Sequence, residues 1–190
     1  MQRSLWMCAV CAIGFAGCAP DSSPDGASFN RTIVVLHPDG TQDVRTEQIT
    51  VEQQQTEIAV RAQRLQQAAS GVGVAQQALT QDTGCAGSSM WLFDQATLTG
   101  NEICFTGQGY ANFSSYFDTC YGTPPRCNTW ATSVRSFWSG FEGGYFIPSS
   151  GPAEFFYPYV RVDSADSIVQ QARLLCLEDN YWTAPTFCGG

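Results

Sequence analysis

The sequence predicts a mainly β protein, a Greek-key sandwich braced by disulfides and preceded by a β-hairpin and one amphipathic helix. From Cys85 onward, short aromatic and β-branched runs alternate with Gly, Asn, Ser and Pro at intervals of about 8–12 residues, which is typical of antiparallel sandwiches. The same region carries an even set of cysteines, as small exported domains do. Earlier in the chain, Pro38-Asp39-Gly40 predicts a tight turn between two strands.

The N-terminal residues 1–17 predict an export signal. A single charge, Arg3, precedes an apolar run from Leu5 to Gly17, which has the length of a signal-peptide core and is too short to span a bilayer. The run ends Phe15-Ala16-Gly17-Cys18, which resembles the lipobox of bacterial lipoproteins, with Phe15 where Leu is usual. The resemblance implies cleavage before Cys18, acylation of this cysteine with palmitate-type chains, and a lipid-anchored place in the cell envelope. Ordinary secretion with a free Cys18 thiol is the alternative.

Charge and cysteine content narrow the function classes. All nine basic residues are Arg, against seventeen Asp and Glu, so the chain lacks the basic surface that nucleic acids require.

Once the leader and Cys18 are set aside, six cysteines remain, which predict three disulfides. Many pairings are open to six cysteines, and we predict nearest-neighbour pairs: Cys85 with Cys104, Cys120 with Cys127, and Cys176 with Cys188. No zinc site is expected, because no pair shows Cys-x2-Cys spacing and His37 is the only histidine.

The N-terminal half contains a tether and a helical segment. Residues 18–30 combine Pro, Gly, Ser and Asp without periodicity and predict a flexible tether. Within residues 31–83, the runs Thr32–His37 and Val44–Ile49 are the expected hairpin strands. Thr50 and Gln53 form a capping-box pattern that predicts a helix start, and Ser70-Gly71 predicts its end. The expected apolar helix face is formed by Val51, Ile58, Ala62, Leu65 and Ala69.

This hairpin and helix cannot bury much surface alone. The segment is therefore expected either to dock on the main domain or to pair with another chain. The Gln-rich side of the helix is interpreted as solvated surface, and residues 71–84 as a loose connector.

Residues 84–190 are expected to form the main domain. Its predicted strands are Met90–Phe93, Glu102–Phe105, Ser133–Phe137, Gly144–Ile147 and Phe155–Val162. The stretch Ala165–Leu175 spaces its apolar residues like a helix face.

Three segments resemble a known family. Phe93 to Gly100 resembles the crystallin signature of two aromatics and a Gly, with Leu98 in place of the second aromatic. Gly107 to Tyr116 is similar to the Gly-x-Tyr-x-Asn-Leu-Ser-x-Tyr segment of bacterial metalloproteinase inhibitors, with Phe113 for Leu. Asn128 to Arg135 is similar to their Trp-Asn-Asp-Lys-Ala-Ser-Ser-Val-Arg segment. The resemblance implies a Greek-key βγ-crystallin-like fold, in a group that includes calcium binders and inhibitors of secreted metalloproteinases.

The C-terminal half departs from this pattern. Gly140 to Phe146 only loosely resembles the opening of a second motif. Asp163 to Val169 faintly echoes Asn128 to Val134, which competes with the helix prediction for the same residues. The second motif is thus expected to be eroded or absent.

Calcium is the first functional candidate suggested by the resemblance. Calcium-binding crystallins carry two Asn or Asp residues, two free positions, and then Ser or Thr followed by Ser, because Ca²⁺ takes clustered oxygen ligands. The ligand set would be Asn128, Thr132 and Ser133, with Thr129 in the second Asn or Asp position. Losing that ligand predicts a weak site. The alternative is that Thr132 and Ser133 hold the backbone by side-chain hydrogen bonds.

Protease inhibition is the second candidate. A disulfide between Cys120 and Cys127 would close a short loop that carries Pro124, Pro125 and Arg126. Such a stiff loop loses little conformational entropy on binding. The alternative is an insertion stapled only for stability.

Binding through exposed aromatics to an envelope glycan or protein is a third class. The aromatic residues concerned are Phe137, Trp138, Phe141, Tyr145, Phe146, Phe155, Phe156, Tyr157 and Tyr159, and most of them are expected in the core. Enzymatic activity is not expected, because no nucleophile, base and acid arrangement is visible and His37 lies beside a turn. The sequence therefore predicts a non-catalytic binding or structural module without a resident cofactor, with protease inhibition and weak calcium binding as alternatives.

Overall fold

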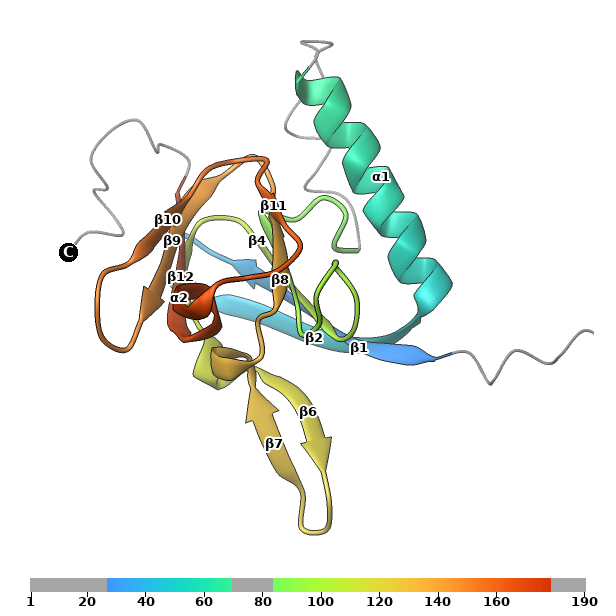
Figure 1. Cartoon of the computed structure of the whole chain (residues 1–190), viewed down its shortest axis with the longest axis vertical. Coiled ribbons are helices and arrows are strands. Elements are labelled where there is room, and N and C mark those ends of the chain that lie inside the picture. The colour runs from blue at the N-terminus through green and yellow to red at the C-terminus, as the bar shows by residue number, and fades with distance from the viewer. Residues whose placement is uncertain (1–26, 70–83, 179–190) are drawn as a thin grey trace, which may run out of the picture.

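The computed structural model of this chain describes residues 27–69 and 84–178 (Figure 1). The predicted leader, Cys18, the tether up to residue 26, the predicted helix end at Ser70-Gly71, the connector up to residue 83 and Cys188 lie outside the described residues. Within these residues, no helix is long and apolar enough to span a membrane.

A six-stranded sheet forms the first layer. Its order is β11-β8-β3-β4-β1-β2, and all neighbours pair antiparallel except β1 and β4, which are parallel. The strands are β1 (Ser28–Leu36), β2 (Gln42–Thr50), β3 (Met90–Phe93), β4 (Glu102–Thr106), β8 (Ser136–Ser139) and β11 (Arg161–Val162).

A four-stranded antiparallel sheet forms the second layer, in the order β10-β9-β12-β5. Its strands are β5 (Gly109–Asn112), β9 (Gly143–Pro148), β10 (Glu154–Phe156) and β12 (Ala172–Glu178). A separate hairpin of β6 (Phe117–Tyr121) and β7 (Arg126–Thr129) projects away from both sheets (Figure 1).

The two layers exchange strands. β3, β4 and β8 lie together in the first sheet, whereas β5, which comes between β4 and β8 in sequence, joins the second sheet. In the same way, β9, β10 and β12 lie together and β11 crosses to the first sheet. The mainly β fold with disulfides, a preceding hairpin and one long helix is therefore confirmed.

The N-terminal hairpin belongs to the main sheet. β1 pairs with β2 from Ser28 opposite Thr50 to Leu36 opposite Gln42, and its other edge pairs with β4. The tight turn predicted at Pro38-Asp39-Gly40 connects the two strands, and Gly40 has a φ of +83° there. Because β1 begins at Ser28, the last residues of the predicted tether are strand.

Helix α1 (Val51–Ala69) packs on the outer face of the first sheet. The predicted capping box is present, because the Thr50 amide donates to Gln53 Oε1 at 2.8 Å and the Gln53 amide donates to Thr50 Oγ1 at 3.2 Å. Ile58, Ala62 and Leu65 contact the cluster around Trp91, as expected of the apolar face. However, Gln54 and Arg61 are fully buried in the same interface, so the polar side of α1 is only partly solvated.

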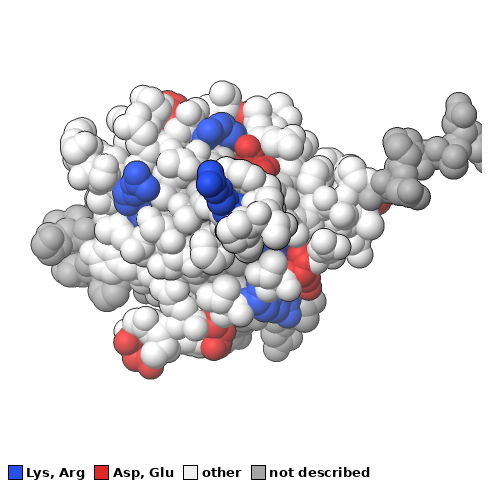
Figure 2. Space-filling view, turned by 90° about the horizontal axis from the view of Figure 1, so that it is seen from below, with Lys and Arg blue, Asp and Glu red and all other residues white. Residues whose placement is uncertain are grey.

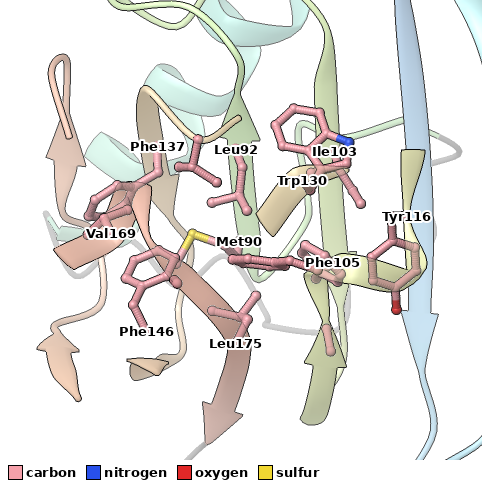
Figure 3. Close-up of a cluster of buried hydrophobic side chains, with 14 of the residues drawn as sticks. Met90, Leu92, Ile103, Phe105, Tyr116, Trp130, Phe137, Phe146, Val169 and Leu175 are labelled. Carbon is pink, nitrogen blue, oxygen red and sulfur yellow. The ribbon is translucent and has the colours of Figure 1, made fainter. Parts of the chain in front are cut away.

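The main core lies between the two sheets. Met90 and Leu92 of β3 face Phe146 of β9 and Leu175 of β12 across this layer (Figure 3). The alternate residues of β3, Trp91 and Phe93, face α1 instead. β3 is thus buried on both faces, which explains its unbroken apolar run.

Two predicted strand boundaries were wrong. The strand expected at Ser133–Phe137 begins only at Ser136, because Trp130–Thr132 form a 3₁₀ turn just before it. The Ser133 amide closes this turn by donating to the Trp130 carbonyl oxygen at 3.3 Å. The strand expected at Phe155–Val162 is divided into β10 and β11. Tyr159 between them has a φ of +65°, which is incompatible with a continuous strand.

The helix expected at Ala165–Leu175 is also corrected. Only α2 (Ser167–Gln170) is helical, with its first amides capped by the Asp166 carboxylate, and β12 follows from Ala172. β12 pairs with β9 on one side and β5 on the other. A central strand buries residues on both faces, so its apolar residues can also match the spacing of a helix face. Pairing with distant strands decides whether such a segment forms a helix or a strand.

Candidate functional site

The β6–β7 hairpin is the most prominent feature of the surface. Phe117 pairs with Thr129, Cys120 with Cys127 and Tyr121 with Arg126. The predicted disulfide between Cys120 and Cys127 is present, with a Cα–Cα distance of 4.0 Å. Residues 122–125 form the turn, in which Gly122 has a φ of +81°. The disulfide therefore closes the hairpin next to its tip.

Buried aromatic side chains anchor the base of this hairpin. Phe113 and Tyr116 precede β6 and Trp130 follows β7, and all three are buried in the core between the sheets. The Trp130 amide donates to the carbonyl oxygen of Tyr116 at 3.1 Å, which ties the two ends together. The ring of Phe105 packs 5.6 Å from that of Tyr116 (Figure 3). The base is consequently rigid, whereas the tip stands in solvent.

A polar cluster fixes β6 to the body. Asp118 is buried, and its carboxylate accepts a hydrogen bond from the Asn101 amide group at 3.2 Å. The same Asn101 group lies 3.1 Å from the hydroxyl of Thr119. Burial, and secondarily the charge of Asp118, raises the pKa of the neighbouring Asp94 to about 6. Two carboxyl groups therefore share a partly dry site at the root of the hairpin.

The tip carries the residues that the sequence singled out for inhibition. Pro124, Pro125 and Arg126 are all exposed. Two large apolar side chains accompany them on β6: Phe117 is 61% exposed and Tyr121 is 56% exposed. Sequence reasoning did not select these two aromatics, although Tyr121 lies inside the short Cys120–Cys127 loop, where a side chain has little access to a core.

Beside the hairpin lies a groove of about 360 Å³. Phe117 and Tyr116 line one side, and Thr32, Val44 and Thr46 of the first sheet line the other. On the face of the molecule seen from below Figure 1, basic and acidic side chains are scattered over a mostly uncharged surface (Figure 2). Neither sign of charge therefore dominates this face.

The proposed calcium ligands are not gathered into a site with carboxylates. Asn128 and Thr132 are exposed, and Ser133 is buried. The Ser133 hydroxyl donates to the carbonyl oxygen of Thr129 at 3.1 Å, as the structural alternative predicted. Within residues 27–69 and 84–178, no three His, Cys, Asp or Glu side chains come close enough to hold a metal ion.

The aromatic residues divide between core and surface. Phe137, Trp138, Phe146 and Phe156 are buried. A partly exposed group runs along β9, β10 and the residue after β10, with Tyr145 packed 5.1 Å from Phe155 and Phe155 packed 4.7 Å from Tyr157. A second partly exposed pair joins Phe141 and Tyr159 at 5.3 Å.

The remaining predicted residues have the following positions. Cys85 and Cys104 form the predicted disulfide, with a Cα–Cα distance of 5.6 Å. Cys176 is disulfide-bonded, and its predicted partner Cys188 lies outside the described residues. His37 Nε2 lies 2.9 Å from the Asp43 carboxylate at an exposed strand end.

Comparisons with family models, with curated proteins and with solved structures give no match to this chain. The functional argument therefore depends on the geometry of the chain itself.

Proposed function

We propose that this chain is a non-catalytic binding module that contacts a protein partner through the β6–β7 hairpin. The observation that carries the proposal is the combination of a disulfide next to the tip with exposed Phe117 and Tyr121 on a buried aromatic base. Large exposed aromatics on a rigid element bind at low entropic cost. A hairpin kept only for stability would have no need of two half-exposed aromatic side chains.

We further propose that residues 84–178 form a βγ-crystallin-like module with two Greek-key motifs, in place of the eroded or absent second motif that the sequence predicted. The exchange of β5 and β11 between the sheets supports two interleaved four-strand motifs. The loop after β3 supports the family signature, since Leu98 is fully buried and Gly100 has a φ of +90°. Ser136 holds this loop by accepting from the Leu98 amide at 3.0 Å and donating to the Gln95 carbonyl at 2.6 Å.

The proposed location is the outside of the cell, on a lipid anchor. The pattern Phe15 to Cys18 supports acylation, and the disulfides Cys85–Cys104 and Cys120–Cys127 support an oxidising compartment. Intact-mass analysis of the membrane-extracted protein should find acyl chains on Cys18, and Cys18→Ser should release the protein from membranes. An unmodified soluble mature form would contradict the anchor.

Partner binding can be tested with the full chain extracted in mild detergent and immobilised. Envelope and secreted proteins retained by the natural chain should be lost from a Phe117→Ser/Tyr121→Ser variant. Tyr157→Ser is the matched control, because Tyr157 is 58% exposed but lies away from the hairpin. If the hairpin variant retains the same proteins as the control, the hairpin is not the contact surface. Loss only in the control variant would move the site to the aromatics of β9 and β10.

Protease inhibition is the second candidate function. Exposed Pro124, Pro125 and Arg126 in a closed turn favour it, because an inhibitory loop must enter an active-site cleft already in its bound shape. The full chain should be titrated against secreted metalloproteinases and serine proteases. Inhibition that is lost in Arg126→Ala and in Cys120→Ser/Cys127→Ser would support the loop. Inhibition that survives both changes would place the reactive surface elsewhere.

A further inference from the structure

Strand β2 presents a long edge at the end of the first sheet. Among the described residues it pairs with β1 alone, and it runs for nine residues without proline or bulge. The other edge strands are short: β11 has two residues, β10 three and β5 four. Exposed edges offer a row of backbone N–H and C=O groups to another strand, and proteins usually shorten, bulge or cover them. Of these four edges, β2 is the one that is both long and regular.

The charges on this edge are self-complementary. Asp43, Arg45 and Glu47 alternate along one face of β2, in the order negative, positive, negative. Two antiparallel registers with a two-fold axis bring opposite charges together. With the axis at Val44, each Arg45 lies opposite Asp43 of the second copy, and with the axis at Thr46 it lies opposite Glu47 of the second copy. Opposite charges directly across a strand pair stabilise the pairing.

The other face of β2 carries apolar surface that a second strand would cover. Val44 is 53% exposed and lines the groove beside the hairpin with Thr46 and Phe117. From Gln42 to Gln48, every residue of β2 is exposed. A β-branched residue at the centre of an edge strand suits cross-strand packing.

We propose that β2 pairs antiparallel with β2 of a second copy of this chain, which joins the two six-stranded sheets into one continuous sheet. Charge complementarity selects a second copy as the partner. The pairing uses backbone hydrogen bonds, two Arg–acid pairs and the covered Val44 side chains.

The first test measures the mass of the full chain in mild detergent by sedimentation equilibrium. The natural chain should be a dimer at micromolar concentration, and Arg45→Glu should shift it to monomer, because acid then faces acid in either register. Arg45→Lys keeps the charge and should remain dimeric. Because Arg45 is exposed, neither substitution should disturb the fold. Circular dichroism spectra and melting temperatures of both variants that match those of the natural chain will show that the fold is intact. A monomeric natural chain, or an Arg45→Glu variant as dimeric as the natural chain, overturns the proposal.

The second test uses single cysteines on non-reducing gels. Opposed residues in an antiparallel pair lie about 5 Å apart between Cα atoms, within disulfide range. Val44→Cys should therefore cross-link if the axis lies at Val44, and Thr46→Cys if it lies at Thr46. In both registers, Gln48 lies at least four residues along the strand from Gln48 of the second copy, a separation of about 13 Å. Gln48→Cys should therefore not cross-link. Cross-linking at Val44 or Thr46 alone supports the dimer and identifies its register, whereas equal cross-linking at Gln48, or none at any position, contradicts it.

Discussion

The guanidinium group of Arg61 lies 5.6 Å from the ring centroid of Trp138 and donates a hydrogen bond of 2.9 Å to the carbonyl oxygen of the same residue. Its other amino group donates to the carbonyl oxygen of Ser88 at 2.9 Å, and the ring of Trp91 lies 5.9 Å away. One helix side chain thus satisfies backbone acceptors from β8 and from the loop before β3. This contact fixes α1 to the main domain.

Replacing Arg61 with Leu should lower the free energy of unfolding by about 2–4 kcal/mol, because buried carbonyl oxygens lose their donors. Denaturant unfolding followed by circular dichroism will measure this change. Gln63→Leu is the control on the same helix, where the side chain is exposed and the change should stay within about 0.5 kcal/mol. Equal stability of the two variants would contradict the role assigned to Arg61.

The buried ion pair between Arg31 and Glu102 supports a second prediction. Arg31 also lies 2.8 Å from Glu57 of α1, and Glu102 accepts from the Gln54 amide group. Arg31→Met should lower the free energy of unfolding by about 3–5 kcal/mol, because the Glu102 carboxylate is left buried without its cation. The double variant Arg31→Met/Glu102→Leu should recover much of that loss. A double variant no more stable than Arg31→Met would show that packing, not charge, dominates at this site.

Protonation of Asp94 should make stability depend on pH. Its pKa is held at about 6 in the folded chain, above the ordinary 3.8, so the folded state binds this proton more tightly. The resulting stabilisation is complete below about pH 4 and is lost as pH rises through 6. Asp94→Asn should therefore stabilise the chain at pH 7.5, by up to about 1 kcal/mol once solvent screening is allowed for.

The measurement for Asp94 is the melting temperature between pH 4 and pH 8. The difference between the natural chain and Asp94→Asn should widen as the pH rises. Asp118→Asn is the companion variant, because it removes the neighbouring charge and keeps an oxygen that accepts from Asn101. A difference that is constant across this range would exclude a proton-linked effect.

The two described disulfides should differ in their effect on stability. Cys85–Cys104 closes a separation of 19 residues and both cysteines are buried, whereas Cys120–Cys127 closes a separation of seven residues in solvent. Loop-closure entropy alone predicts losses of about 3 kcal/mol and about 2 kcal/mol for the respective Cys→Ser pairs. Burial of the serines adds to the first loss. Chemical unfolding of both double variants will test this order, and the reverse order would contradict it.

Calcium should give little stabilisation at sub-millimolar concentration. Thr129 stands where the family pattern has Asn or Asp, and the Ser133 hydroxyl is already hydrogen-bonded. A ligand that binds only the folded state raises the melting temperature, so thermal unfolding with and without calcium measures the site directly. Thr129→Asp should add a calcium-dependent shift. A large shift in the natural chain would instead make Asn128, Thr132 and Ser133 ligands.

Local chemistry explains which elements the sequence predicted well. The turn at Pro38-Asp39-Gly40, the capping box of Thr50 and Gln53, and the run Met90–Phe93 each depend on neighbouring residues alone, and all three are confirmed. The nearest-neighbour pairs Cys85–Cys104 and Cys120–Cys127 are also confirmed. Cys120 and Cys127 lie opposite each other in the β6–β7 hairpin, so they meet as soon as these strands pair.

Long-range pairing explains the elements that were predicted incorrectly. The apolar spacing of Ala165–Leu175 suits a helix face, but its last residues, from Ala172, form the central strand β12 by pairing with β9 and β5. Nothing near Arg61 in sequence signals that four backbone carbonyls from other segments surround it. For the candidate site, the cysteines and prolines of the loop were visible in the sequence, whereas the exposure of Phe117 was not.

By itself, the sequence determined the local turns, caps and strand runs, the pairing of neighbouring cysteines and the mainly β class, because each follows from interactions between residues close in the chain. Only the tertiary structure decided that the hairpin of β1 and β2 extends the main sheet, that β5 and β11 exchange layers, and that β2 is left as a long edge. These outcomes depend on which strands distant in sequence form hydrogen bonds with one another, and on which faces of the sheets are covered by apolar side chains of other elements. A linear pattern of residues does not specify that choice, because many pairings satisfy the same alternation of polar and apolar side chains.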